Sequence, residues 1–361
     1  MNIFLLNYII ISVEAFFLLY RPAKNEEFTD KYKLGCKKAF IVLACIQWIM
    51  ISGLRADSVG SDTGNYMRIF DMHKNMTFDD LINYFKNYYT NDGDYEPGYV
   101  LLERVIAIFT HNHVVYKFII AIIFMSSMGK FIYKHSEDPF MAFVLYSGLF
   151  YNMFSLTGYR QVISVTIGIF WGYEYIKKRK FMSFLILVLI ASTFHKSTLI
   201  FLLYYFMYNK KVDGLYAVVS LAIIGFMIVN RNQLFYYVKD IVGYDEYGVE
   251  GNFTQRNFLI MAGMLAILVI WRFKHVVQVH PKAHSYYNAL ILSGMMLPFA
   301  MVSPTSMRLV YDFGFMLMSL LPLVLKSIKI ERDKVLIYGA IVAVFGFFVA
   351  TRTPEYLFFW Q

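Results

Sequence analysis

The sequence predicts an all-α polytopic integral membrane protein, and three observations lead to this fold class. Of the 361 residues, 58% are hydrophobic and only 16% are charged, whereas soluble domains carry about a quarter charged residues. Apolar runs such as "KFMSFLILVLIASTF" and "DKVLIYGAIVAVFGFFVA" recur along the chain. These runs are evenly spread along the chain. A chain that crosses lipid so many times does so as helices, because a helix satisfies its own backbone hydrogen bonds. We therefore expect a single polytopic membrane domain over residues 1–361.

About 12 apolar runs are candidate transmembrane helices. The pair around His195 is short for two crossings of about 20 residues each, so a tilted or broken hairpin is expected there. Residues 97–110 are also too short to cross and contain Glu103 and Arg104, which predicts a re-entrant or interfacial helix near 97–110. The candidate runs are residues 2–20, 38–54, 115–133, 140–157, 161–176, 181–194, 196–208, 212–229, 257–273, 285–302, 308–325 and 334–350.

Loop charges predict the orientation. Short loops between the apolar runs hold 21 of the 34 Lys and Arg, and placing these loops in the cytoplasm follows the positive-inside rule. The net charge of +9 is then explained by orientation, and we expect no nucleic acid partner. Residues 55–113 and 231–256 become extracytoplasmic loops, and both termini lie outside. The inner loops are 21–38, 130–134, 177–180, 210–211, 272–282 and 326–334.

The outer basic residues differ in type from the inner ones. Eight Arg and five Lys lie outside, against four Arg and seventeen Lys inside. Orientation accounts for the inner lysines but not for the outer arginines. A guanidinium can grip phosphate oxygens with two bonds, so the outer face is predicted to hold a phosphorylated ligand. The alternative is that these arginines pair with outer acids or lipid head groups.

Two outer segments carry candidate residues before the middle of the chain. In "GLRADSVGSDTGNYMRIF" Arg55 ends an apolar run, and Asp62 and Tyr66 follow in a Gly-containing loop. Asp62 or Thr63 is also a good helix N-cap, so a structural role is open. In "NDGDYEPGYVLLERV" Glu96 precedes a Pro-Gly turn, which in isolation is a weak signal.

A third segment, "SLTGYRQVISV", places Arg160 and Gln161 inside an apolar stretch. An arginine at that depth is costly unless it has a partner, which a phosphate or an acid from the first outer loop would supply.

Three further sites complete the outer set. His195 and Lys196 lie at the apex of the short hairpin, and a histidine there serves as a base or donor, or only as a structural residue. Arg308 begins an apolar run four residues before Asp312, so a helical ion pair is the competing explanation. Arg256 ends the second outer loop. Composition and spacing indicate no metal site and no nucleotide-binding loop.

These segments together resemble the EpsG/Wzy group of bacterial polysaccharide polymerases. The resemblance rests on spaced motifs in one order: "LRADSVGSDTGNY", "YEPGYVLLERVI", "GYRQVISVTIGIF…YIKKRKFMSFLILVLIASTFHKSTLIF" and "SMRLVYDF". It implies a GT-C-like glycosyltransferase of the bacterial cytoplasmic membrane, acting on the extracytoplasmic side. Its substrates would be undecaprenyl-pyrophosphate-linked oligosaccharides, both as donor and as acceptor. A chain-length-regulating co-polymerase would be a partner, and no cofactor is expected.

A working hypothesis assigns roles to the candidates. Arg55, Arg160 and Arg308 hold pyrophosphate, with His195 assisting, because guanidinium groups stabilise a leaving diphosphate without a metal. Asp62 is the first choice for general base and Glu96 its rival. The remaining substrate-binding candidates are Gln161, Tyr66, Lys196 and Arg256. The alternatives are a related O-antigen ligase, a GT-C transferase using a polyprenyl-phosphate sugar, and a flippase for the lipid-linked units.

Overall fold

The computed structural model describes residues 2–91, 95–149, 151–242 and 256–361. Over these residues the chain is helical, and extended pairing is limited to an isolated bridge between Arg55 and Phe358. The expected all-α class is therefore confirmed for the described part of the chain.

The helices follow one another with short connections. The first group is α1 (Ile3–Ala15), the π-helical turn η1 (Phe16–Tyr20), α2 (Arg21–Lys24), α3 (Asp30–Leu54), α4 (Thr63–His73) and α5 (Phe78–Asn91). The second is α6 (Pro97–Phe109), α7 (His113–His135), α8 (Pro139–Gly148), α9 (Tyr151–Thr157), α10 (Tyr159–Val165), η2 (Thr166–Trp171), α11 (Tyr173–Lys177) and α12 (Phe181–Ser192). The third is η3 (Lys196–Ile200), α13 (Phe201–Met207), α14 (Gly214–Val229), α15 (Arg231–Val242), α16 (Arg256–Trp271), α17 (Phe273–Val279), α18 (Ala283–Val302), η4 (Pro304–Ser306), α19 (Met307–Gly314), α20 (Leu317–Lys326) and α21 (Glu331–Arg352).

Helix length and hydropathy give between four and eight membrane spans in the described residues. Four continuous helical stretches are long and apolar enough to cross a bilayer: Ile3–Lys24, Asp30–Leu54, His113–His135 and Glu331–Arg352. Four bent pairs raise the number to eight if each pair is one span; α19 and α20 form one of these pairs and are bent by 53°. The sequence-based count of 12 and the GT-C-like arrangement stay predictions. The short length expected for the two runs around His195 is confirmed, since Phe181–Ser192 and Lys196–Met207 are both shorter apolar helices.

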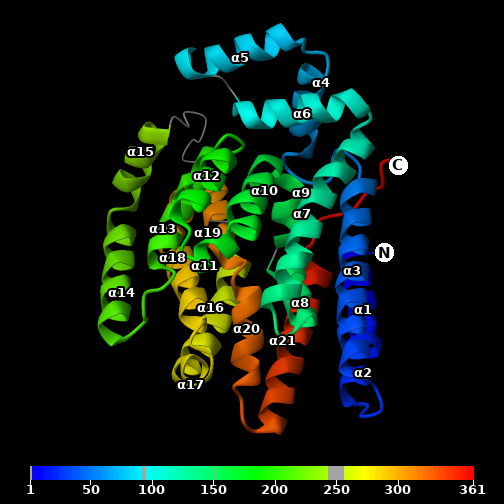
Figure 1. Ribbon diagram of the computed structural model, residues 1–361, viewed down its shortest axis with the longest axis vertical. Helices are drawn as coiled ribbons and strands as arrows, with labels where there is room; N and C mark the ends of the chain where they lie inside the picture. Colours follow the sequence, from blue (N-terminus) through cyan, green and yellow to red (C-terminus); the bar gives the residue numbers. More distant parts are fainter. Residues whose placement is uncertain (1, 92–94, 150, 243–255) are drawn as a thin grey trace.

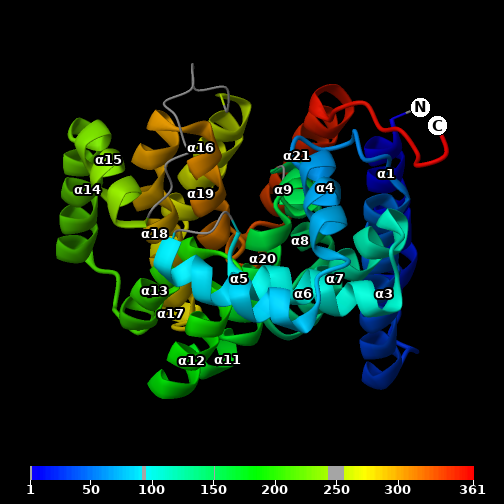
Figure 2. The same ribbon diagram turned by 90° about the horizontal axis from the view of Figure 1, so that it is seen from above.

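The two ends of the helical bundle differ in what they carry. Figure 1 shows α4, α5 and α6 at one end, with α6 lying across the bundle, and α2, α17 and the α20–α21 turn at the other end. Helices α2 and α17 and the α20–α21 turn lie in the basic loops 21–38, 272–282 and 326–334 of the sequence. These lysine-rich loops are therefore at the end opposite α6. Both termini lie on the same side of the molecule (Figure 2), and Asn2 Nδ2 donates to Thr353 Oγ1 over 2.8 Å, which joins the start of α1 to the end of α21.

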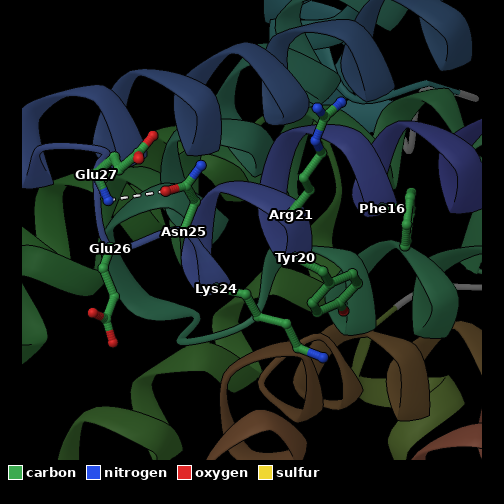
Figure 3. A pocket seen from close by; sticks show the side chains of 7 residues that line it. All are labelled: Phe16, Tyr20, Arg21, Lys24, Asn25, Glu26 and Glu27. Carbon is green, nitrogen blue, oxygen red and sulfur yellow. Dashed lines mark hydrogen bonds between the residues drawn. The ribbon is translucent and has the colours of Figure 1, made fainter.

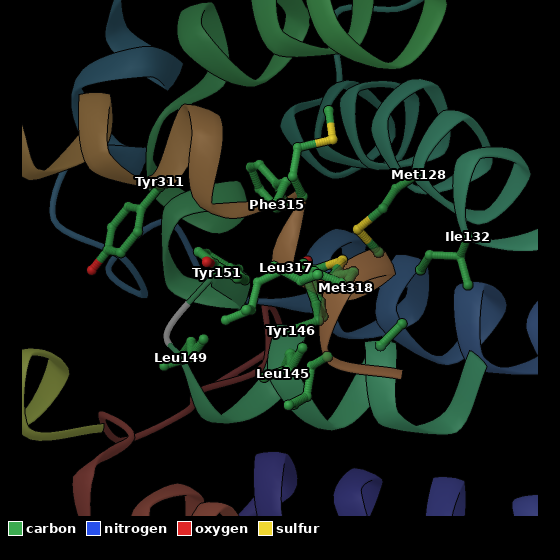
Figure 4. Close-up of a cluster of buried hydrophobic side chains, with 14 of the residues drawn as sticks. Met128, Ile132, Leu145, Tyr146, Leu149, Tyr151, Tyr311, Phe315, Leu317 and Met318 are labelled. Carbon is green, nitrogen blue, oxygen red and sulfur yellow. The ribbon is translucent and has the colours of Figure 1, made fainter. Parts of the chain in front are cut away.

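An aromatic and aliphatic core fills the centre of the bundle. Figure 4 shows side chains from α7, α8, α9, α19 and α20 meeting there. Tyr151 and Phe315 contact with ring centroids 4.7 Å apart, and both are almost fully buried. Because lipid tails are as apolar as these side chains, close packing stabilises the bundle more than exclusion of water does.

One expected helix boundary is wrong. Helix α3 begins at Asp30, eight residues before the expected start at 38, because Thr29 caps it by accepting the Tyr32 N–H, and charged residues extend the helix beyond the apolar run. In the described part of residues 55–113, the expected extracytoplasmic loop between two spans, the chain forms α4, α5 and α6. The short helix expected over 97–110 is present as α6, and residues 231–242 are helical as α15.

Candidate functional site

A buried charged cluster forms where α6, α10 and η3 begin. The Glu96 side chain is 3% exposed; its Oε2 pairs with Arg160 Nη1 at 2.7 Å, and its Oε1 lies 3.3 Å from His195 Nδ1. The backbone N–H of Lys196 also donates to Glu96 Oε1, over 3.3 Å. Glu96 is thus the partner of Arg160. An acid from the first outer loop was one of the two partners expected from the sequence.

A close backbone contact holds Glu96 next to His195. Glu96 is the N-cap of α6, and Pro97 occupies the first position of that helix, where its missing N–H is harmless. Gly98 N donates to the Thr193 carbonyl over 2.8 Å, and a Cβ at Gly98 would overlap Thr193. The Pro-Gly pair therefore allows the start of α6 to pack directly on the hairpin apex.

The pairing keeps the Glu96 carboxyl ionised. Burial would raise its pKa, but the hydrogen bond from His195 and the charge of Arg160 outweigh burial, so the pKa lies well below its usual value. For His195 burial dominates, and the charges of Arg160 and Arg308 act in the same direction. The pKa of His195 is therefore below its usual 6.5 despite Glu96. At neutral pH the ring is neutral and Nδ1–H faces the carboxylate.

A second pair joins α19 to the loop before α4. Arg308 donates to Asp62 Oδ2, so residues 246 positions apart in sequence meet in the fold. Asp62 is the N-cap of α4 by position, but its side chain makes no capping hydrogen bond. The carboxylate is thus directed at the guanidinium and not at its own helix.

A buried amide–acid contact connects the two arginines. Gln161, the neighbour of Arg160 on α10, donates from Nε2 to both carboxylate oxygens of Asp312 at 2.9 Å. Asp312 lies one turn after Arg308 on α19 and is fully buried. Arg308 and Asp312 therefore do not form the i, i+4 ion pair that the spacing suggested. Arg308 pairs with Asp62, and Asp312 accepts from Gln161. The charges of both arginines also lower the pKa of His195, so the two pairs form one cluster. Its residues come from α6, α10, η3, α19 and the N-cap position of α4.

Aromatic rings flank the basic side chains of the cluster. Tyr95 presents its ring to the Arg160 guanidinium, with 5.4 Å between Cζ and the ring centroid, and Tyr88 does the same for Lys196 Nζ at 5.3 Å. Sequence reasoning missed both tyrosines. Their sequence signal is weak, since α5 and the segment before α6 are rich in aromatic residues throughout.

Arg55 and Tyr66 lie apart from this cluster. Arg55 is fully buried and donates to the carbonyls of Val59 at 3.3 Å and Leu156 at 2.7 Å, as well as to Ser52 O and the Tyr159 hydroxyl. Tyr66 stacks on Tyr159 at 4.8 Å between centroids. Arg55 thus ties the end of α3 to the backbone around it, and Tyr66 packs beside it.

Lys117 was missed and belongs with Arg55. It is 1% exposed, donates to the Arg55 carbonyl and pairs with Asp57 Oδ1 at 2.7 Å. Its signal was a lysine inside an otherwise apolar run. Arg256 begins α16, and its side chain lies outside the described part of the chain.

A separate network fastens α6 to α4 and α7. His73 Nδ1 lies 2.6 Å from Glu103 Oε2, and the Tyr116 hydroxyl donates to Glu103 Oε1 over 3.1 Å. All three side chains are buried. The helix whose first turn carries Glu96 is therefore anchored again two turns later.

A cavity of about 780 Å³ lies at the opposite end of the bundle (Figure 3). It lies beside α2, away from the charged cluster, and none of the cluster residues lines it. Over the described residues no three His, Cys, Asp or Glu side chains gather in a way that could hold a metal ion. The cavity is lined by Phe16, Tyr20, Arg21, Lys24, Asn25, Glu26 and Glu27.

The sequence model of the EpsG family matches residues 38–358, which is most of the chain and includes every member of the charged cluster. No curated protein and no solved structure matches.

Proposed function

Because the chain belongs to the EpsG family, we propose that it polymerises surface polysaccharide by joining undecaprenyl-pyrophosphate-linked oligosaccharide repeat units. The family points to a polysaccharide polymerase and to a membrane protein; the lipid diphosphate substrate and the reaction are our proposal. One observation carries it: Arg160, Arg308, His195 and two carboxylates, distant in sequence, meet at the end of the bundle opposite the lysine-rich loops.

The reaction transfers a glycosyl group from a lipid diphosphate to a hydroxyl. The acceptor oxygen attacks the anomeric carbon of the donor, the bond from that carbon to the diphosphate oxygen breaks, and the hydroxyl proton passes to a base. No oxidant, nucleotide or metal is needed to balance this step. The protein has to stabilise charge on the leaving diphosphate and to accept one proton.

His195 is the base in this proposal, and Glu96 orients it. The ring is neutral at neutral pH with Nδ1 facing Glu96, so Nε2 is the nitrogen that takes the proton. The carboxylate then stabilises the imidazolium that forms. Asp62 was the first choice for general base from the sequence. In this proposal it is instead the carboxylate partner of Arg308.

Arg160 and Arg308 bind the leaving diphosphate. Each pairs with a carboxylate, and a diphosphate oxygen competes with a carboxylate for the same guanidinium geometry. Lys196 adds a third positive charge, and Gln161 with Asp312 positions both arginines. Arg55 is left out of the phosphate-binding set because backbone oxygens hold its guanidinium.

We propose that the charged cluster faces the extracytoplasmic side of the bacterial cytoplasmic membrane, and the positive-inside rule supports this orientation. The loops with α2, α17 and the α20–α21 turn lie at the end opposite α6, and these loops hold many of the lysines. Lipid-linked repeat units would enter from the outer leaflet.

Incubation of the purified protein with a defined lipid-diphosphate-linked repeat unit, without nucleotide or metal, tests the proposal. A ladder of products differing by one repeat unit is expected, with release of the lipid diphosphate. A deletion strain separates the related activities: loss of a polymerase leaves lipid capped with one unit, whereas loss of a ligase leaves no capped lipid. Absence of the ladder together with normal polymer in the deletion strain would refute the proposal.

A further inference from the structure

Glu14 is an acid in the first apolar helix, away from the charged cluster. It lies within Ile3–Lys24, one of the four continuous candidate spans. Its neighbours Val13, Phe16 and Phe17 are 50 to 58% exposed, as expected for side chains that face lipid. Nothing in the proposed reaction uses Glu14, and an acid inside a span needs its own explanation.

The partner of Glu14 is an amide on α3. Gln47 Nε2 donates to Glu14 Oε1 over 2.6 Å. The other two oxygens of the pair, Glu14 Oε2 and Gln47 Oε1, are both buried and have no hydrogen-bond partner in the described structure. Two acceptor oxygens cannot bond one another, so an ionised carboxylate leaves both of them unsatisfied.

One proton resolves both deficits. A hydrogen on Glu14 Oε2 turns that atom into a donor, and Gln47 Oε1 is the acceptor left over on the same partner. Exchanging the Gln47 amide atoms does not remove the need, because two oxygens would then lie 2.6 Å apart and again require a proton between them.

No basic side chain is placed to neutralise a charge at Glu14. Among the described residues Glu14 takes part in no ion pair within 4.0 Å. Along the helices the nearest basic residues are Arg21 and Lys38, seven residues after Glu14 and nine before Gln47, or roughly 10 and 13 Å of helix. A carboxylate in hydrocarbon without a cation costs several kcal/mol, whereas a neutral acid avoids most of that cost.

We propose that Glu14 is a neutral carboxylic acid paired with Gln47, and that it is a modification site for apolar carbodiimides. The reagent takes the proton, the carboxylate oxygen adds to its central carbon, and the resulting O-acylisourea rearranges to a stable N-acylurea. No group leaves, so every atom of both reactants stays in the adduct. Glu14 is half-buried as a whole, and the exposed apolar residues around it put it on the lipid side of α1, from which an apolar reagent approaches.

The local backbone supports a special role for this position. The π-helical turn Phe16–Tyr20 begins two residues after Glu14, and such turns are rare and are often found at functional sites. Glu14 and Gln47 join α1 to α3 beside this turn. The pair therefore fixes α1 where its helical geometry changes.

The labelling test uses the full chain in detergent micelles at neutral pH with N,N′-dicyclohexylcarbodiimide, followed by peptide mass spectrometry. We expect the adduct mass on the peptide that contains Glu14 and its loss in Glu14→Gln, while the exposed Glu355 stays unlabelled. A water-soluble carbodiimide with an added amine should reverse this preference. Labelling of Glu355 without labelling of Glu14 by the apolar reagent would overturn the proposal.

Thermal unfolding gives a second test that does not depend on labelling. Glu14→Gln mimics a neutral acid, so its unfolding midpoint should stay within about 1 °C of the unmodified protein, whereas Glu14→Ala should lower it by a few degrees. Equal destabilisation by both variants would show that the charge is needed, and would overturn the proposal.

Discussion

Arg55 and Arg160 both stand at the end of the bundle that carries α6, yet their surroundings differ in kind. Arg55 is fully buried, and backbone carbonyls of the chain around it hold its guanidinium. Arg160 faces the carboxylate of Glu96, a side chain from another segment. A backbone carbonyl cannot leave without unfolding its segment, whereas a carboxylate can be exchanged for phosphate. The type of acceptor, more than the presence of an arginine, separates a structural cation from a binding one.

The largest effect expected from this contrast is on activity at Arg160. Arg160→Gln should lower the rate of polymer formation about 10²–10³-fold, because one donor to the leaving group is lost. Ladder formation by purified protein measures this, and cells should accumulate single repeat units.

The control for that experiment is Arg68→Gln, since Arg68 is exposed and donates to Asn65 on its own helix. A double variant, Arg160→Gln with Glu96→Gln, removes both charges and so avoids leaving a buried carboxylate alone. Normal polymer length in Arg160→Gln would place Arg160 outside the site.

The next effect is on stability at Arg55. Arg55→Met removes the donors to several buried carbonyls and should lower the free energy of unfolding by about 3 kcal/mol. Folded protein that remains should keep its specific activity. Thermal unfolding and rates per folded molecule measure the two quantities, and Arg352→Met on the exposed end of α21 is the matched control. A loss of activity without a loss of stability would return Arg55 to the binding set.

A smaller effect is expected where α6 meets the hairpin apex. Gly98→Ala should move Glu96 away from His195, since the new Cβ overlaps Thr193, at a cost of about 1–3 kcal/mol. Polymerisation should fall more than stability does. Gly64→Ala in α4 is the control, because its Cβ would meet only an ordinary contact 3.6 Å away.

The smallest effect is on pH dependence. A base must be neutral, and the pKa of His195 lies below 6.5, so the rate should be level above neutral pH. It should then fall about tenfold per pH unit below that pKa, as the ring takes a proton. Rates from pH 5 to 8 with substrate well below saturation measure this, because kcat/KM reports the pKa of the free enzyme, and the exposed His111→Gln variant should have the same profile. A rate that increases with acidity would contradict a neutral His195 as base.

Sequence reasoning predicted the class of fold and much of the candidate cluster. The apolar runs predicted an all-helical chain, and the depth of Arg160 implied a partner, either a phosphate or an acid from the first outer segment; Glu96 is such an acid. The start of α3 was misplaced because hydropathy marks where a helix can meet lipid, not where its hydrogen bonds begin.

The roles inside the cluster were less predictable. Spacing on one helix suggested that Arg308 pairs with Asp312. In the structure Arg308 pairs with Asp62, and Asp312 accepts from Gln161. Arg55 looked equivalent to the other outer arginines because sequence does not reveal which acceptors surround a side chain. Such contacts between distant segments depend on packing, and single-helix patterns carry no information about them.

The paired state of the two cluster arginines bears on how long a product stays bound. In the proposed reaction, the lipid diphosphate has to separate Arg160 from Glu96 and Arg308 from Asp62 before it binds both guanidinium groups, and both carboxylates then compete with it. Affinity is thereby kept moderate, which shortens residence of the spent carrier. The proposed reaction releases one lipid diphosphate for each glycosidic bond. Competition from the protein's own carboxylates would speed that release and so raise the turnover rate.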